Sequence, residues 1–191
     1  MTKNLTKEEG SHLIAVARKA IEEHLKGDAS PALDLEAVSS SLKEMGACFV
    51  TLTIDGALRG CVGSIEASQP LIKDVQDRAV GAAFNDPRFP PLRPDEYPGL
   101  KVEVSHLTPP VKLNYSTPEE LINQLRPGID GVILHHQYRR ATFLPQVWDQ
   151  IPDPDLFLGR LCLKMGLEPS TWQKDHIEVE TYQVEKFTEG E

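Results

Sequence analysis

The sequence predicts an α+β fold, in which helices are combined with antiparallel strands. Two hairpin patterns lie near residues 55–56 and 137–138, and separate segments show the apolar periodicity of amphipathic helices. The 191 residues are enough for a well-packed core. We therefore expect residues 1–191 to form a single domain with two lobes.

Each predicted helix follows from a periodic apolar stripe and from residues that can cap it. The first begins with a capping box of Thr6 and Glu9 and stops at Gly27. Ser68 is placed to cap the second helix, and Thr117 to cap the third. The predicted helices span residues 6–26, 70–84, 117–126 and 153–166.

The predicted strands form two hairpins and two further segments. Alternation along residues 47–54 gives one wholly apolar face, and Cys48 on that face is expected to be a core thiol. The acidic tail, residues 185–191, is expected to be frayed. The predicted strands span residues 47–54, 58–63, 100–107, 131–136, 139–144 and 176–184.

Residues 58–63, with the sequence Leu-Arg-Gly-Cys-Val-Gly, are the stretch best suited to chemistry, and two hairpin registers are open to them. A two-residue loop would place Arg59 opposite Leu52 on the apolar side, where an unpaired guanidinium is costly. A three-residue loop would place Arg59 opposite Thr51 and Cys61 opposite Phe49. We prefer the three-residue loop, which also brings two side chains to the apolar face, Leu58 and Val62.

Cys61 is the candidate catalytic residue. In the preferred register Arg59 shares its face, and a guanidinium there would favour the thiolate. Gly60 and Gly63 would let a ligand or another backbone approach closely. A buried structural cysteine, with glycines that serve a bulge or tight packing, explains the same residues equally well. No histidine has a local spacing that identifies a partner, although the fold could bring His106 near.

Basic residues form a second candidate group. Arg59, Arg88, Arg139 and Arg140 could gather with Glu103 on one concave surface that suits a carboxylate or phosphate. Internal pairing of these arginines with carboxylates, between the two halves of the chain, is the alternative. The sequence contains none of the common nucleotide, zinc or hydrolase motifs, so we predict no metal site and no cofactor.

Charge and cysteine content limit the function classes. The formal net charge of −9 argues against extended nucleic-acid binding. No run of about 18 apolar residues is present, and the first residues lack the apolar core of a secretory signal, so no membrane segment or secretion is expected. The three cysteines lack CxxC spacing and indicate free thiols in a reducing, cytoplasmic location.

Residues 58–63 resemble the six-residue signature of the AMMECR domain family, whose bacterial and archaeal members are called AmmeMemoRadiSam system protein A. Val62 stands where isoleucine is commoner. The segment 161–167 resembles the bacterial branch of the family. The resemblance covers nearly the whole chain and includes further segments at residues 79–91, 102–105 and 128–148.

This resemblance implies an α+β fold with an antiparallel, barrel-like sheet flanked by helices, and two unequal lobes with a cleft near residues 58–63. It also implies an association with a Memo-like protein and a radical S-adenosylmethionine protein, but no particular reaction. A small anionic ligand and a homodimer are further expectations.

Two functions are therefore open. In the first, the chain is an enzyme or enzyme subunit of a modification pathway, with Cys61 as the reacting residue. The residues expected to bind its substrate are Arg59, Gly60, Arg88, Glu103, Arg140 and Thr142. In the second, the chain is a non-catalytic binding or adaptor module for a nucleotide, a nucleic-acid end or a partner protein, and the thiol is structural.

Overall fold

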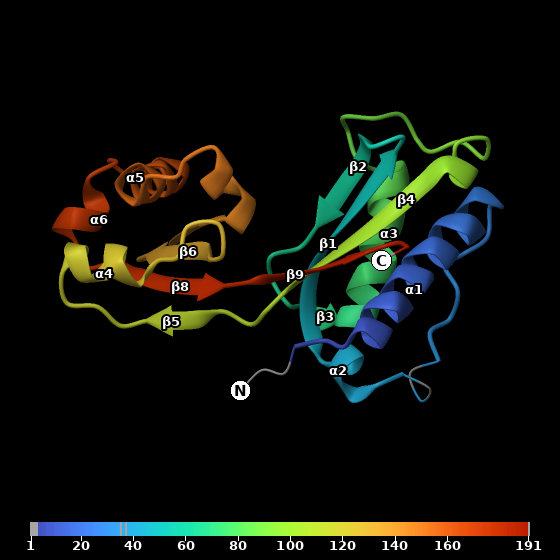
Figure 1. The fold of residues 1–191 in the computed structure, drawn as a ribbon, viewed down its shortest axis with the longest axis horizontal. Coiled ribbons are helices and arrows are strands. Elements are labelled where there is room, and N and C mark those ends of the chain that lie inside the picture. The colour runs from blue at the N-terminus through green and yellow to red at the C-terminus, as the bar shows by residue number, and fades with distance from the viewer. Residues whose placement is uncertain (1–3, 35, 37, 191) are drawn as a thin grey trace. The chain divides into compact units, whose positions relative to one another are not determined.

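The structure, a computed structural model, describes residues 4–34, 36 and 38–190 and divides the chain into two compact units (Figure 1). Unit 1 combines Met1–Thr108 with Glu185–Glu191, and unit 2 comprises Pro109–Val184. Each unit has its own sheet and its own hydrophobic core.

Unit 1 is built on a five-stranded sheet with the order β2-β1-β4-β9, to which β3 adds by pairing with β1. Helices α1 and α3 pack against the sheet and against each other (Figure 1). The strands are β1 (Met45–Ile54), β2 (Ala57–Gly63), β3 (Gln69–Pro70), β4 (Leu100–Leu107) and β9 (Val184–Thr188). The helices are α1 (Lys7–Leu25), α2 (Ser40–Lys43), α3 (Leu71–Phe84) and the 3₁₀ helix η2 (Tyr97–Gly99).

The core of unit 1 follows the predicted alternation. Cys48, Val50 and Leu52 on β1 are completely buried, while Thr51 between them is only partly buried. Small side chains on α3, among them Ala79 and Ala82, allow this helix to lie close to the sheet. Both the core role of Cys48 and the apolar face of β1 are therefore confirmed.

The predicted cap of α3 and the predicted fraying of the tail are both wrong. Ser68 does not cap α3, because the residue at the N-cap position is Pro70 and no side chain caps that end. The tail is not frayed over its described residues, because β9 occupies Val184–Thr188 and the N–H of Glu189 donates to the carbonyl of Val102 over 3.0 Å. Arg18 on α1 binds the Glu189 carboxylate at 2.7 Å, which anchors the end of the chain.

Unit 2 carries a four-stranded sheet with the order β5-β8-β6-β7. The predicted hairpin between β6 and β7 is confirmed, with Gln137 at its turn in the left-handed region at φ 55°. The strands are β5 (Val111–Leu113), β6 (Gly131–His136), β7 (Arg139–Phe143) and β8 (Glu178–Tyr182). The helices are α4 (Pro118–Gln124), α5 (Pro154–Lys164), α6 (Thr171–Lys174) and the 3₁₀ helix η3 (Pro145–Asp149).

The core of unit 2 combines aliphatic side chains with a pair of stacked aromatic rings. The rings of Trp148 and Phe157 stack with centroids 3.6 Å apart, and the Trp148 indole N–H donates to the carbonyl of Asp130 over 2.7 Å. Cys162 on α5 is completely buried in the same core, and burial raises the pKa of its thiol. Cys162 is therefore a structural cysteine, as predicted.

The mixture of helices with antiparallel strand pairs confirms the α+β class. The term barrel-like applies only loosely, because neither sheet closes on itself within the described residues. Within the same residues, no helix is both long enough and apolar enough to cross a membrane.

Candidate functional site

The β1–β2 hairpin differs from the preferred register in its turn. Asp55 and Gly56 alone form the loop, at φ values of 51° and 79°, so the predicted three-residue loop is wrong. A β-bulge follows the turn: Leu58 faces Thr53 and Gly60 faces Leu52, so that Arg59 is left without a partner on β1. The bulge removes the difficulty of a two-residue loop, because Arg59 no longer lies opposite Leu52.

The bulge also decides what Cys61 faces. Cys61 pairs with Thr51 rather than with Phe49, and the Thr51 hydroxyl donates to the Cys61 sulfur over 3.4 Å. Thr51 in turn pairs with Glu103 on β4, so these three side chains form a row across three strands. The polar face predicted for Cys61 is therefore confirmed, although the partner is different.

Of the two side chains expected on the apolar face, Leu58 and Val62, only Val62 lies there. Val62 pairs with Val50, whose side chain is completely buried, as expected for the apolar face. Leu58 pairs with Thr53 and is 43% exposed, so its predicted core position is wrong. The extra residue of the bulge shifts Leu58 by one position relative to β1, which moves it to the other face.

The two glycines of the stretch serve packing. A Cβ atom on Gly60 would lie 2.0 Å from the main-chain oxygen of Ala82 on α3, so only glycine permits this contact. A Cβ atom on Gly63 would lie 2.3 Å from the ring of Phe49, which covers it from β1. A close backbone neighbour thus explains Gly60, and its assignment as a substrate-binding residue receives no support from this geometry.

Asp86 and Arg88 hold the main chain of Cys61. The Cys61 N–H donates to Asp86 Oδ2 over 2.8 Å, and Arg88 Nη2 donates to the Cys61 carbonyl over 3.3 Å. The same two residues form an ion pair at 2.7 Å. Hydrogen bonds from the Arg88 side chain and the Cys61 main chain hold the pKa of Asp86 well below its usual range, although burial opposes them. We call this arrangement the Asp86–Arg88 clamp.

The side chain of Arg59 also forms its hydrogen bonds within unit 1. Its guanidinium makes two hydrogen bonds to Glu96, from Nε at 2.8 Å and from Nη2 at 3.0 Å. Nη2 also donates to the carbonyl of Pro90 over 3.0 Å, and the Arg59 and Arg88 guanidinium groups both lie near the ring of Phe89. Arg59 thus fastens the segment 89–96 to β2, and the Cys61 sulfur is not among its hydrogen-bond partners in the described residues.

The residues of the predicted anion-binding cluster are therefore distributed over the two units. Arg59 and Arg88 are paired with carboxylates of their own unit, which agrees with the internal-pairing alternative, except that each pair lies within one unit. Arg139 donates to the carbonyls of Met165 and Gly166 in unit 2. Glu103 lies on β4 of unit 1, partly exposed and 3.9 Å from Lys186.

The two remaining candidates, Arg140 and Thr142, lie on β7 in unit 2. Arg140 is exposed, whereas Thr142 is 8% exposed. The Thr142 hydroxyl shares a 3.1 Å hydrogen bond with the hydroxyl of Tyr182, and its carbonyl accepts from Lys164. Thr142 is therefore engaged in the interior of its own unit.

His106 is not a partner of Cys61. It pairs with Cys48 on β1, which places it on the helix-covered face, whereas Cys61 lies on the face of Thr51 and Glu103. Its Nδ1 atom lies 2.9 Å from Glu185. The suggestion that the fold brings His106 to Cys61 is therefore wrong.

A buried carboxylate that the sequence interpretation missed supports the end of β2. Asp74 on α3 is completely buried and accepts hydrogen bonds from Ser64 at 2.5 Å, Gln69 at 3.1 Å and Arg78 at 3.1 Å, as well as from Cys48. Burial alone would raise the pKa of Asp74, but these hydrogen bonds outweigh it and the pKa is lowered. The sequence did contain a signal for this residue, because Asp74 is an acidic residue within the apolar stripe of a predicted helix.

Comparison with known proteins identifies the family. The family model described as AMMECR1 matches residues 14–187, which is most of the chain. The chain belongs to the AMMECR1 family. The match extends through both units, so the hairpin with Cys61, the segment 86–96 and the sheet of unit 2 are all parts of one family domain model.

Similar proteins come from archaea. A protein of Methanothermobacter thermautotrophicus is 38% identical over 188 residues, covering 97% of this chain and 96% of its own length. Protein MK0488 of Methanopyrus kandleri is also 38% identical and covers the whole chain, with 93% of its own length matched. The bacterial subtype inferred from residues 161–167 stays a prediction.

One solved structure has a similar fold over nearly the whole chain. The crystal structure of uncharacterized protein PH0010 from Pyrococcus horikoshii matches with a TM-score of 0.79 and 35% identity. The match covers 97% of this chain and 94% of the other.

Proposed function

We propose that the chain is an enzyme, or a subunit of one, in which Cys61 supplies the reacting thiol. The observation that carries this proposal is the setting of the Cys61 side chain. It is partly exposed on the polar face of the sheet and accepts a hydrogen bond from Thr51, while the Asp86–Arg88 clamp fixes its main chain. Cys48 and Cys162 are completely buried and lack this setting.

The chemical role of each group follows from its contacts. A hydroxyl that donates to sulfur stabilises the negative charge that a thiol carries when it acts as a nucleophile. The clamp limits motion of the strand, and a fixed main chain reduces the entropy lost when the sulfur meets a substrate. Glu103, next to Thr51 in the same row, is the carboxylate available to bind or orient a substrate from the sheet face.

Arg59 and Arg88 act through position rather than through direct charge on the sulfur. Each guanidinium is neutralised by a carboxylate, Glu96 for Arg59 and Asp86 for Arg88. We therefore assign both as positioning residues. Arg140 and Thr142 remain proposals as substrate contacts, as does a small anionic substrate.

The wider setting of this function is proposed from the family. Bacterial and archaeal members are called AmmeMemoRadiSam system protein A, so a Memo-like protein and a radical S-adenosylmethionine protein are the proposed partners in a modification pathway. The three free cysteines fit a cytoplasmic location. We further propose that both units act together as a single domain, and that the chain forms a homodimer.

Alkylation of the full chain with iodoacetamide at pH 7, followed residue by residue with mass spectrometry, tests the proposal. We expect Cys61 to react faster than free cysteine, while Cys48 and Cys162 stay protected until urea is added. Thr51→Val keeps the side-chain shape but removes the donor, and should slow alkylation of Cys61 roughly threefold, as expected for one lost hydrogen bond.

Two results would overturn the role of Cys61. One is alkylation of Cys61 no faster than that of free cysteine. The other is full cellular activity of a Cys61→Ser variant whose melting temperature equals that of the wild type. The buried Cys162→Ser variant is the control for general effects of losing a thiol.

One observation favours the alternative, a binding or adaptor module. Both arginines of the predicted site fasten residues 86–96 to β2, which builds a rigid surface loop instead of an open anion site. On this view the loop is the recognition element and Cys61 is structural. Cellular activity that survives Cys61→Ala but is lost after substitution of exposed loop residues such as Pro87 would favour the alternative.

A further inference from the structure

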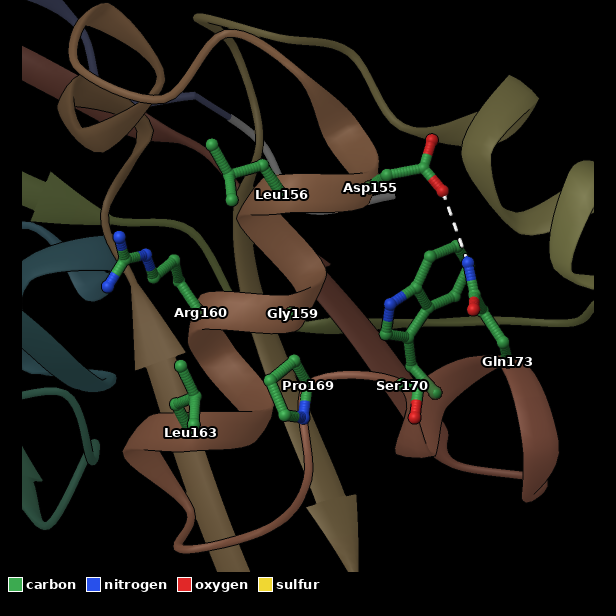
Figure 2. Close-up of a pocket in the computed structure, with 9 residues that line it drawn as sticks. Asp155, Leu156, Gly159, Arg160, Leu163, Pro169, Ser170 and Gln173 are labelled. Carbon is green, nitrogen blue, oxygen red and sulfur yellow. Dashed lines mark hydrogen bonds between the residues drawn. The ribbon is translucent and has the colours of Figure 1, made fainter.

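A groove lies along α5 in unit 2, and none of the candidate site residues lines it (Figure 2). Its volume is about 470 Å³. Gly159 forms its floor beside Pro169, and Gln173 on α6 closes one end by donating to Asp155 on α5 over 3.3 Å. Figure 2 shows Leu156, Arg160 and Leu163 projecting from one side of α5.

The residues on this side of α5 have the spacing of a helix–helix seam. Leu156, Gly159 and Leu163 occupy positions i, i+3 and i+7, which fall on one stripe of a helix about 10 Å long. Leu156 and Leu163 are 52% and 48% exposed, so the stripe is apolar and unpartnered in the described chain. A Cβ atom on Gly159, between the two leucines, would lie 3.4 Å from the carbonyl oxygen of Pro169, so the stripe has a leucine at each end and Pro169 beside its middle.

Arg160 shows what charge the occupant carries. It is the only one of the nine arginines without a hydrogen bond, ion pair or ring contact to the described residues. In seams with this spacing, the residue that follows the middle stripe position forms ion pairs with the partner helix. An arginine at this position would form an ion pair with a carboxylate on the helix that occupies the groove.

We propose that this groove docks an amphipathic helix of a partner protein, with apolar side chains for the stripe and a carboxylate for Arg160. A second copy of this chain fits this groove less well, because pairing α5 with its own copy about a two-fold axis would bring two Arg160 guanidinium groups together near the middle of the stripe. The stripe is about two turns long, so a helix of two to three turns is enough to fill it. The proposal does not depend on the reactivity of Cys61.

The probe is a library of helical peptides of about 15 residues, displayed on phage and selected against the full chain. We expect enriched peptides to share apolar residues at i, i+3 or i+4 and i+7, with a glutamate or aspartate beside them. Arg160→Glu and Leu163→Asp should each weaken binding of the best peptide by at least about tenfold, the effect of one hot-spot contact. The matched control, Lys19→Glu on the exposed side of α1, should leave it unchanged.

A charge swap makes the test specific. Replacing the acidic residue of the peptide with lysine should abolish binding to the wild type and restore it on Arg160→Glu. The proposal is overturned if no peptide is enriched, if the enriched peptides lack an acidic residue, or if their binding survives both groove substitutions. It is equally overturned if the wild-type chain dimerises and Leu163→Asp makes it monomeric, because the groove is then filled by a second copy.

Discussion

Asp86 accepts a hydrogen bond from the main-chain N–H of Cys61 over 2.8 Å, and this aspartate is only 4% exposed. It also accepts from the main-chain N–H and the guanidinium of Arg88. One carboxylate therefore fixes both the strand that carries the thiol and the loop that follows α3.

Asp86→Ala should lower the free energy of unfolding by about 1–3 kcal/mol, because it leaves the partly buried Cys61 N–H without its acceptor and Arg88 without its counter-charge. Urea unfolding measures the change. Asp95→Ala is the control: the Arg93–Asp95 pair is exposed, with side chains 67% and 70% accessible, and its loss should change stability by less than about 0.5 kcal/mol. Equal effects of the two substitutions would contradict the importance of the clamp.

Glu96 should make stability depend on acid pH. The hydrogen bond from Arg59 lowers the pKa of Glu96 to about 2. Because the folded pKa lies below the unfolded value of about 4.3, the stabilisation is complete above that value and is lost as the pH falls from about 4.3 towards 2. The stability difference between wild type and Glu96→Gln, followed by urea unfolding from pH 7 down to pH 3, should therefore shrink. A difference that stays constant would contradict the pairing.

Two Gly→Ala substitutions should change the free energy of unfolding in opposite directions. Gly60→Ala places a Cβ atom against the main-chain oxygen of Ala82 at 2.0 Å, so α3 or β2 must move, and a loss of about 2–3 kcal/mol is expected. Gly159→Ala meets Pro169 no closer than 3.4 Å, inside a helix, and should gain about 0.5–1 kcal/mol. Thermal unfolding of both variants tests this. A destabilised Gly159→Ala variant would mean that Pro169 lies too close to Gly159 to admit a Cβ atom.

Deleting residues 184–191 should destabilise unit 1 by at least about 3 kcal/mol. The deletion removes β9 and with it the Arg18–Glu189 and His106–Glu185 contacts, as well as Phe187, which packs against Gly10 on α1. Deleting only residues 190–191 is the control and should have little effect. The melting temperature reports both, and similar values for the two truncations would contradict a structural role of β9.

Local signals in the sequence were enough for most elements. The Thr6–Glu9 capping box, the hairpin at Gln137 and the N-cap at Thr117 are all found where they were predicted. Each depends on residues a few positions apart, whose geometry is set by short-range hydrogen bonds. Such features can be recognised without knowledge of the rest of the chain.

The site was harder to predict because its partners are distant in sequence. A bulge cannot be inferred from alternation, since a single extra residue exchanges the two faces without changing composition. The carboxylate that pairs with Arg59 is Glu96, which lies 37 residues away in the sequence, so the pairing depends on the path of the loop that carries Glu96. The fraying of the tail was predicted from its charge, yet Arg18 on α1 supplies the opposite charge that orders Glu189.

The position of Cys61 has a consequence for association between chains. β2 is the outer strand of its sheet, and an outer strand with free N–H and C=O groups is a template for a strand from another molecule. At Cys61 both groups are already taken by side chains, Asp86 on the N–H and Arg88 on the C=O. The ion pair thus stands in for a neighbouring strand, and it shields this edge of the sheet from intermolecular β-pairing and aggregation.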